Sequence, residues 1–315
     1  MRSAHLAAVG AMALVAATAA MAETRAPVTE SALMADVRTL ASAEFAGRRT
    51  GTAGNRLAQA YIARRFEQIG LKPFGASYAM RFRFFDMRAR LTTIYPGAVN
   101  LVGHIRGSAH PERYIVVSAH YDHLGVHRGA THFGADDNAS GVAAMLAVAA
   151  HFRQHPPKNT IVFAAFDGEE LGLRGAKSFV DAAPVPIKNV ALNLNFDMVS
   201  RSAKNEIYAA GTRYTPALKA LVEKAAVGSS VKVLTGHDSK VPGAPPDHDW
   251  TNSSDHAAFH NAGIPFVYFG VEDHADYHQP GDTFEKINPA FFSAVTRMLV
   301  TAADVFDQNL DVIKK

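Results

Sequence analysis

The chain has 315 residues, of which 48% are hydrophobic and 19% are charged, and this balance excludes an intrinsically disordered protein. The formal net charge of +3 is too small to indicate a nucleic-acid-binding surface. There is no cysteine, so disulfides and thiolate metal sites are excluded, and any metal ligand must be His, Asp or Glu.

The first 22 residues have the pattern of a secretory signal peptide. Arg2 supplies a positive charge, residues 6–20 are an apolar run, and residues 20–22 (AMA) form a small-x-small cleavage site. The run is shorter than the about 20 apolar residues that cross a bilayer. We therefore expect cleavage before Glu23, export to the periplasm or the medium, and no membrane anchor in the mature protein.

Two helices are predicted in the first part of the mature chain. Residues 31–42 have helical spacing, and residues 55–70 place apolar side chains on one face and end at Gly70. The glycine-rich segment FAGRRTGTAGN (45–55) connects them. No strand precedes this segment and no Lys-Ser/Thr pair follows it, which argues against a phosphate-binding loop.

From residue 99 onward, short apolar strands alternate with helices. Helices are predicted at 140–154, 173–182, 215–227, 253–262 and 289–308, and strands at 113–120, 160–166, 189–199 and 264–270. Continuous apolar strands between helices are typical of a largely parallel sheet that is covered on both faces. We therefore predict a single three-layer α/β/α domain over residues 23–315, with a mixed, mostly parallel central sheet.

Polar side chains follow each of these strands, at the edge where open α/β sheets bind ligands. Burying several carboxylates together is costly without cations, so this concentration predicts a metal centre. Nitrogen and oxygen ligands without sulfur suit zinc, and five of them suit two ions if one carboxylate bridges; cobalt or manganese could replace zinc. The candidate ligands are His120, Asp137, Glu170, Asp197 and His278.

Six motifs carry a resemblance to a known family. HYDHLG, GADDNASG, DGEELGLRGA, NLNFDM, SSDHAAF and DYHQPGDT occur in this order, and with these gaps the chain resembles the exported zinc aminopeptidases of metallopeptidase family 28. The resemblance covers nearly the whole mature chain, including FAGRRTGTAGN. It implies a zinc-exopeptidase-like fold, two Zn²⁺ ions, and peptide substrates with a free N-terminus.

The resemblance also implies how the candidate ligands share two zinc ions. Asp137 would be the bridging carboxylate, followed by a cis peptide bond. One ion would take His120 and Asp197, and the other would take Glu170 and His278.

Four further residues receive roles from the same resemblance. Glu169 matches the general base, and Tyr277 matches a hydrogen-bond donor to the developing oxyanion. Asp122 matches the acid that orients the imidazole of His120. Asp255 is either a similar supporting acid or the cap of a short helix.

Other activities remain open at this point. A glutaminyl-cyclase-like acyltransferase would use one zinc ion, and a non-catalytic binding module would have lost some ligands. A carboxypeptidase of the same fold would need a cation for the substrate carboxylate, for which Arg174 and Arg201 lie near the motifs. The loop 241–254, which holds the single Trp, borders a pocket or is an irregular surface loop. Asp136 is given no chemical role, and the oligomeric state is not predicted.

Overall fold

The structure is a computed structural model, and it describes residues 29–87, 92–240 and 248–313. The predicted signal peptide (1–22) and the first half of the loop 241–254 lie outside the described residues.

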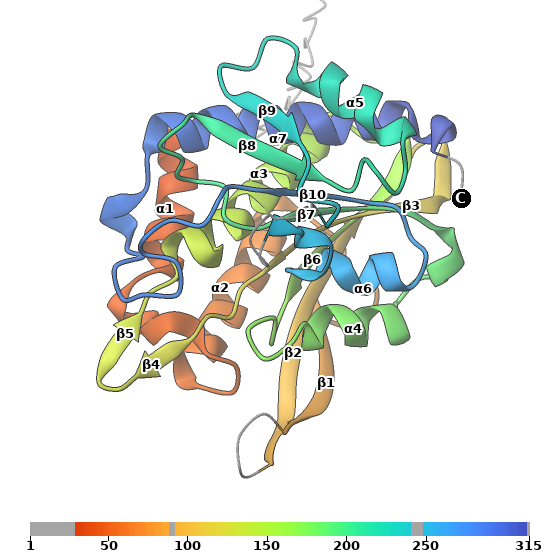
Figure 1. Ribbon diagram of the computed structural model, residues 1–315. Coiled ribbons are helices and arrows are strands. Elements are labelled where there is room, and N and C mark those ends of the chain that lie inside the picture. The colour runs from red at the N-terminus through yellow and green to blue at the C-terminus, as the bar shows by residue number, and fades with distance from the viewer. Residues whose placement is uncertain (1–28, 88–91, 241–247, 314–315) are drawn as a thin grey trace, which may run out of the picture.

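An eight-stranded sheet forms the centre of the molecule, in the order β1-β2-β6-β3-β7-β10-β8-β9 (Figure 1). The central strands β6, β3, β7 and β10 are parallel to one another, whereas β1, β2 and β8 are antiparallel to their inner neighbours. The predicted mixed sheet is therefore confirmed. The strands are β1 (Ala79–Asp86), β2 (Thr93–Ile105), β3 (His110–His120), β6 (Asn159–Phe166), β7 (Val190–Phe196), β8 (Glu206–Ala210), β9 (Lys232–Thr235) and β10 (Phe266–Gly270), and β4 (Gly125–His127) and β5 (Ala130–His132) form a separate hairpin.

Helices cover both faces of the sheet, which confirms the three layers. Successive strand residues point to opposite faces, so Val117 packs with one set of helices and Val116 with the other. On the face of Val117 lie α1 (Glu30–Leu40), α2 (Ala53–Ile69), α3 (Gly141–Gln154), α5 (Ala217–Ala226) and α7 (Pro289–Gln308), and on the face of Val116 lie α4 (Arg174–Asp181) and α6 (His256–Asn261).

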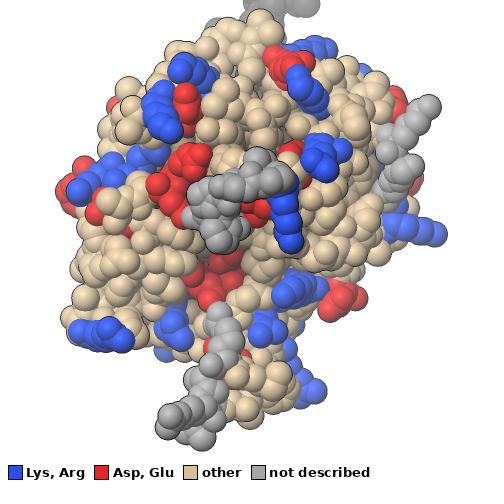
Figure 2. Space-filling view, in the orientation of Figure 1, with Lys and Arg blue, Asp and Glu red and all other residues tan. Residues whose placement is uncertain are grey.

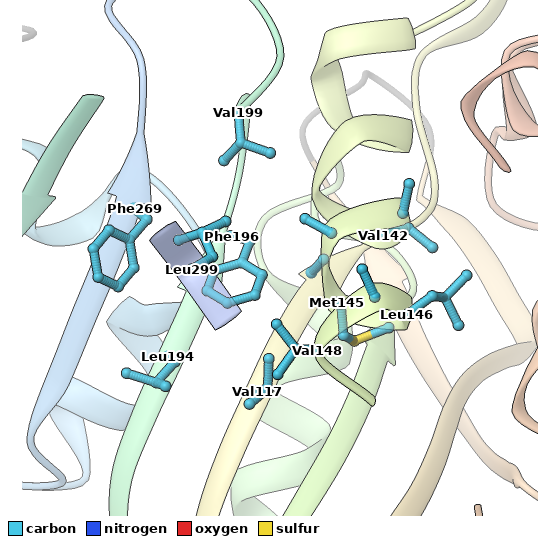
Figure 3. Packing of buried hydrophobic residues seen from close by; sticks show 14 of the residues in the cluster. Val117, Val142, Met145, Leu146, Val148, Leu194, Phe196, Val199, Phe269 and Leu299 are labelled. Carbon is cyan, nitrogen blue, oxygen red and sulfur yellow. The ribbon is translucent and has the colours of Figure 1, made fainter. Parts of the chain in front are cut away.

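The helix α3 lies at the centre of the larger core. Its side chains Met145 and Val148 lie opposite Val117 of β3, beside Phe196 of β7 (Figure 3). A helix that is apolar on nearly all sides must be buried, and α3 is enclosed by the sheet, α1, α2 and α7. Within the described residues, α7 is the one helix long and apolar enough to cross a membrane, but 61% of its apolar window is buried inside the protein.

The glycine-rich segment 45–55 does not form an open loop. It contains the end of the helical turn η1 (Ala43–Arg48) and the start of α2, which is capped by the Thr52 side chain. Gly47 adopts a φ of 69°, and a Cβ there would lie 2.2 Å from the carbonyl oxygen of His132. This segment therefore packs tightly against the chain that leads to residue 134. The short strands β8 and β9 were not predicted.

Candidate metal centre

The parallel strands bring the predicted ligands to one edge of the sheet. His120 is the last residue of β3, Glu170 follows β6, and Asp197 follows β7. His278 lies in the loop after β10, and Asp137 lies in η2 (Ala135–Ser140), just before α3. All five side chains line one cavity of 560 Å³. Acidic side chains gather near the middle of this face of the molecule, with basic ones around them (Figure 2).

The two oxygens of Asp137 face two different groups of ligands. The Nε2 atom of His120 lies 3.3 Å from Asp137 Oδ1 and 3.3 Å from Asp197 Oδ1. On the other side, the Nε2 atom of His278 lies 3.2 Å from Asp137 Oδ2 and 3.3 Å from Glu170 Oε2. A carboxylate placed in this way can bridge two ions.

These separations fit metal ions better than direct hydrogen bonds. Zinc bonds of about 2.0–2.1 Å in tetrahedral geometry place neighbouring ligand atoms about 3.3 Å apart, whereas N–H···O hydrogen bonds cluster near about 2.9–3.0 Å. In the described part of the chain, Asp137 Oδ2 is buried without a hydrogen-bond partner. His120, Asp137 and Asp197 form one group that could hold an ion, and a second group contains Asp137 and Glu170.

His123 belongs to this second group, although the sequence analysis gave it no role. Its side chain is completely buried, and its Nδ1 atom lies 2.7 Å from Glu170 Oε1. This contact is shorter than the about 3.3 Å that separates two ligand atoms of a tetrahedral zinc ion, so we interpret His123 as a direct partner of Glu170. The oxygen of Glu170 that it contacts, Oε1, is not the one that faces His278. The signal in the sequence was a second histidine three residues after His120, in HYDHLG.

Asp122 contacts His120 differently from the expectation. The Nδ1 atom of His120 lies 3.1 Å from the backbone carbonyl oxygen of Asp122 and 3.9 Å from its carboxylate. The carboxylate instead accepts a hydrogen bond of 3.0 Å from the backbone N–H of Glu169. A ring nitrogen bonded to a carbonyl fixes the imidazole tautomer, so the backbone of residue 122 orients the ring and its side chain holds the next loop.

Glu169 and Tyr277 both line the cavity, as their predicted roles require. Burial raises the pKa of the Glu169 carboxyl well above its usual range, while the imidazole of His120 opposes this shift. Burial and the charge of Asp137 raise the pKa of the Tyr277 phenol, which therefore keeps its proton. The Tyr277 ring stacks on His278, with 3.9 Å between the ring centres.

Asp255 lies beside the centre and does not cap the helix that follows it. It precedes α6, but its side chain accepts no capping hydrogen bond. Burial raises its pKa to about 7, which the imidazole of His120 opposes and the charge of Asp197 favours. Asp255 was expected to be either a supporting acid or the cap of this helix. The structure shows no capping bond, and it shows a buried acid that interacts with His120 and Asp197.

The chain around Asp137 is held by two further acids. Asp136 accepts hydrogen bonds from the Ser200 N–H at 2.8 Å and the Ser200 hydroxyl at 2.6 Å. Asp282, in DYHQPGDT, accepts the N–H groups of Asp136 and Asp137, each at 3.0 Å. The peptide bond between Asp137 and Asn138 is cis, as the resemblance implied. Neither Asp136 nor Asp282 had been given a role.

The two arginines considered for a substrate carboxylate are engaged elsewhere. Arg174 donates to the Leu171 carbonyl at 2.9 Å, and Arg201 pairs with Asp276 at 2.7 Å. Among the described residues that line the cavity, Lys177 is the one basic side chain besides the histidines. The described part of the loop 241–254 does border the cavity, through Trp250 and two neighbours.

The chain belongs to Peptidase family M28, whose sequence model matches residues 100–303. The probable zinc metalloprotease of Pyrenophora tritici-repentis is 39% identical over 113 residues, which are 35% of this chain and 26% of that protein. Aminopeptidase YwaD of Bacillus subtilis is 32% identical over 188 residues, which are 57% of this chain and 38% of that protein. The matches thus span about a quarter to two fifths of the length of these curated relatives.

Solved structures show the same fold. BSAP, a zinc aminopeptidase from Bacillus subtilis, has a TM-score of 0.70 at 18% identity, over 92% of this chain and 96% of that chain. The glutaminyl cyclase of Porphyromonas gingivalis has a TM-score of 0.68 at 20% identity, over 88% of this chain and 98% of that chain. At such identities the likeness concerns the fold alone. An aminopeptidase and a glutaminyl cyclase both share this fold.

We expect that His123→Asn will weaken zinc binding, because Glu170 loses the contact at its second oxygen. Outer partners of metal ligands typically contribute a factor of about 10–100 to metal affinity. Competition with a chromophoric chelator measures this loss. The control is His155→Asn, an exposed histidine at the end of α3, which should bind zinc as the unchanged protein does. An unchanged affinity in His123→Asn would contradict the role.

Proposed function

We propose that this protein is an exported metallo-aminopeptidase that holds two zinc ions and removes N-terminal residues from peptides. The observation that carries the proposal is the arrangement of Asp137, whose two oxygens face His120 on one side and His278 on the other. Membership of a peptidase family supports hydrolysis as the reaction.

The complete ligand set favours two ions. A centre with a single ion, as in the cyclase alternative, would leave one oxygen of Asp137 and its facing histidine without a cation. Buried carboxylates without a cation are unfavourable. Three carboxylates and a hydroxide also balance the charge of two divalent ions, so the centre would be close to neutral.

The residues around the cavity supply the remaining chemistry of peptide hydrolysis. When bound, zinc lowers the pKa of water toward about 7 and polarises the scissile carbonyl. Glu169 lines the cavity. We assign it the role of the base that accepts a proton from the attacking water and then donates this proton to the leaving amine. Tyr277 keeps its phenolic proton and can donate a hydrogen bond to the oxygen on which negative charge develops.

The charge of the cavity favours a substrate with a free amino terminus. The acids Glu169 and Asp273 line it together with the carboxylates of the proposed ligands, so a cationic ammonium group is attracted. A carboxypeptidase would need a cation close to the centre, but Arg174 and Arg201 are bonded elsewhere. Lys177, the basic side chain that lines the cavity, donates to the Gly172 carbonyl at 3.0 Å and is outnumbered by the acids. The polarity of the cavity therefore supports an aminopeptidase.

Purified protein is expected to hydrolyse aminoacyl p-nitroanilides, to lose this activity with a chelator, and to regain it with zinc. Elemental analysis should find about two zinc ions per chain. A matched set of N-acetylated peptides should not be cleaved, because they lack the ammonium group. One zinc ion per chain together with cyclisation of N-terminal glutamine would reject the proposal in favour of the cyclase.

Glu169→Gln should retain zinc and lose activity, because the amide cannot accept the proton of water. General acid–base groups contribute about 10²–10⁴-fold, so kcat should fall by at least this much while the zinc content is unchanged. Glu223→Gln, an exposed change on α5, is the control. A kcat within a few-fold of the unchanged protein would rule out Glu169 as the base.

Export is also part of the proposal, and it rests on the pattern of residues 1–22. Expression of the full chain in a Gram-negative host should give mature protein in the periplasm or medium, with Glu23 as its first residue. N-terminal sequencing of that material measures the cleavage site. Recovery of uncleaved chain in the cytoplasm only would contradict the assignment.

A further inference from the structure

The segment 45–55, FAGRRTGTAGN, precedes the part of the chain that the family model matches. It contains Arg48, whose side chain is completely buried. Arg48 has a φ of 53°, in the left-handed region that residues other than glycine seldom adopt. A buried cation in such a conformation is costly unless its partners compensate for the lost solvation.

The guanidinium group of Arg48 bonds backbone carbonyl oxygens from three parts of the chain. It donates to Tyr121 at 2.8 Å, to Gly134 at 2.8 Å and to Phe133 at 2.7 Å, and also to the end of α1. Tyr121 directly follows the proposed ligand His120, and Gly134 lies three residues before Asp137. One planar, rigid group therefore joins the backbones of two ligand-bearing segments.

The positive charge of Arg48 also interacts with the acids of the centre. Burial lowers its pKa to about 10, while the charges of Asp137 and Asp282 oppose this shift. Arg48 is therefore protonated at neutral pH. Its charge partly offsets the repulsion among these carboxylates.

The same segment reaches a third ligand-bearing loop. The Thr50 hydroxyl donates to Asp167 Oδ1 at 2.8 Å, and Asn55 Nδ2 donates to the same oxygen at 3.0 Å. Asp167 is the first residue after β6 and precedes the loop that carries Glu169 and Glu170.

We propose that residues 45–55 form a brace for the metal centre, in which Arg48 is a positioning residue that sets the distance between the segments of His120 and Asp137. Thr50 and Asn55 hold the loop of Glu170 in the same way. The inference rests on the metal centre of the proposed function, but it does not depend on which reaction the centre performs. The brace keeps the ligands in place, so that zinc binds without a large rearrangement of the chain.

The test compares zinc affinity in Arg48→Lys, Thr50→Val and Arg65→Met by competition with a chromophoric chelator. Lysine keeps the charge but cannot join two segments with a planar fork. We expect Arg48→Lys to lower zinc affinity about 10–100-fold and Thr50→Val to lower it less, as outer partners of metal sites do. Arg65→Met removes a half-buried ion pair with Asp36 at 2.7 Å, which joins α1 and α2 and lies on neither ligand-bearing loop.

Arg65→Met is the control because it should lower the melting temperature, through loss of the ion pair with Asp36, without changing a contact to the centre. Its zinc affinity should equal that of the unchanged protein. Wild-type zinc affinity in both Arg48→Lys and Thr50→Val, or an equal loss in Arg65→Met, would overturn the brace. Should Arg48→Lys fail to fold, the comparison of Thr50→Val with Arg65→Met decides the question. Unchanged protein that binds zinc but cleaves no peptide would reject the proposed function alone, whereas unchanged protein that binds no zinc would reject both.

Discussion

The burial of several carboxylates together at one edge of the sheet is the constraint on which this site depends. Burial raises the pKa of Glu169 and of Asp197 above their usual ranges. Asp137 is the exception, because the neighbouring imidazoles outweigh its burial and hold its pKa well below the usual range. The acid that lies between the two groups of ligands is thus the one most strongly favoured as a carboxylate. A carboxyl group can bind an ion through each oxygen only when it is deprotonated, and the imidazoles around Asp137 stabilise this form.

Several acids of this region bind backbone N–H groups instead of lining the cavity. Asp122 holds the N–H of Glu169, and Asp282 holds the N–H groups of residues 136 and 137. Asp136 is bonded to Ser200, which follows the strand that ends near Asp197. Each such bond fixes the backbone beside a proposed ligand, so the loops after parallel strands keep a defined position. The cost of burying these acids is offset by charge-assisted hydrogen bonds.

The fold and the convergence of the five candidate ligands on one cavity could be predicted because they follow simple patterns. Apolar strands alternate with helices, and polar residues follow each strand. Asp282 could not be found in this way, since nothing in the sequence shows that a loop side chain reaches a residue far along the chain. His123 was marked only by its place three residues after His120, which does not show that its ring reaches Glu170. The carboxylate of Asp122 was expected at the His120 ring, yet the backbone carbonyl lies there, because strand periodicity does not specify how a side chain turns beyond the strand end. The sequence showed that the segment 45–55 lacks the features of a phosphate loop, but it did not show why the segment is rich in glycine. In the structure, Gly47 and Gly54 allow close packing against backbone oxygens.

The two halves of the centre differ in their access to solvent, and the topology explains why. The side chain of His120 is 1% exposed because it ends a central strand, whereas that of His278 is 38% exposed because it lies in a loop after β10. The pair of Asp276 with Arg201 holds this loop two residues before His278. His120 is therefore fixed by the sheet, whereas His278 is partly open to solvent and its loop is held by the pair of Asp276 with Arg201. His278 therefore lies on the solvent side of the cavity with Tyr277 beside it, while His120 and Asp197 form the buried inner wall.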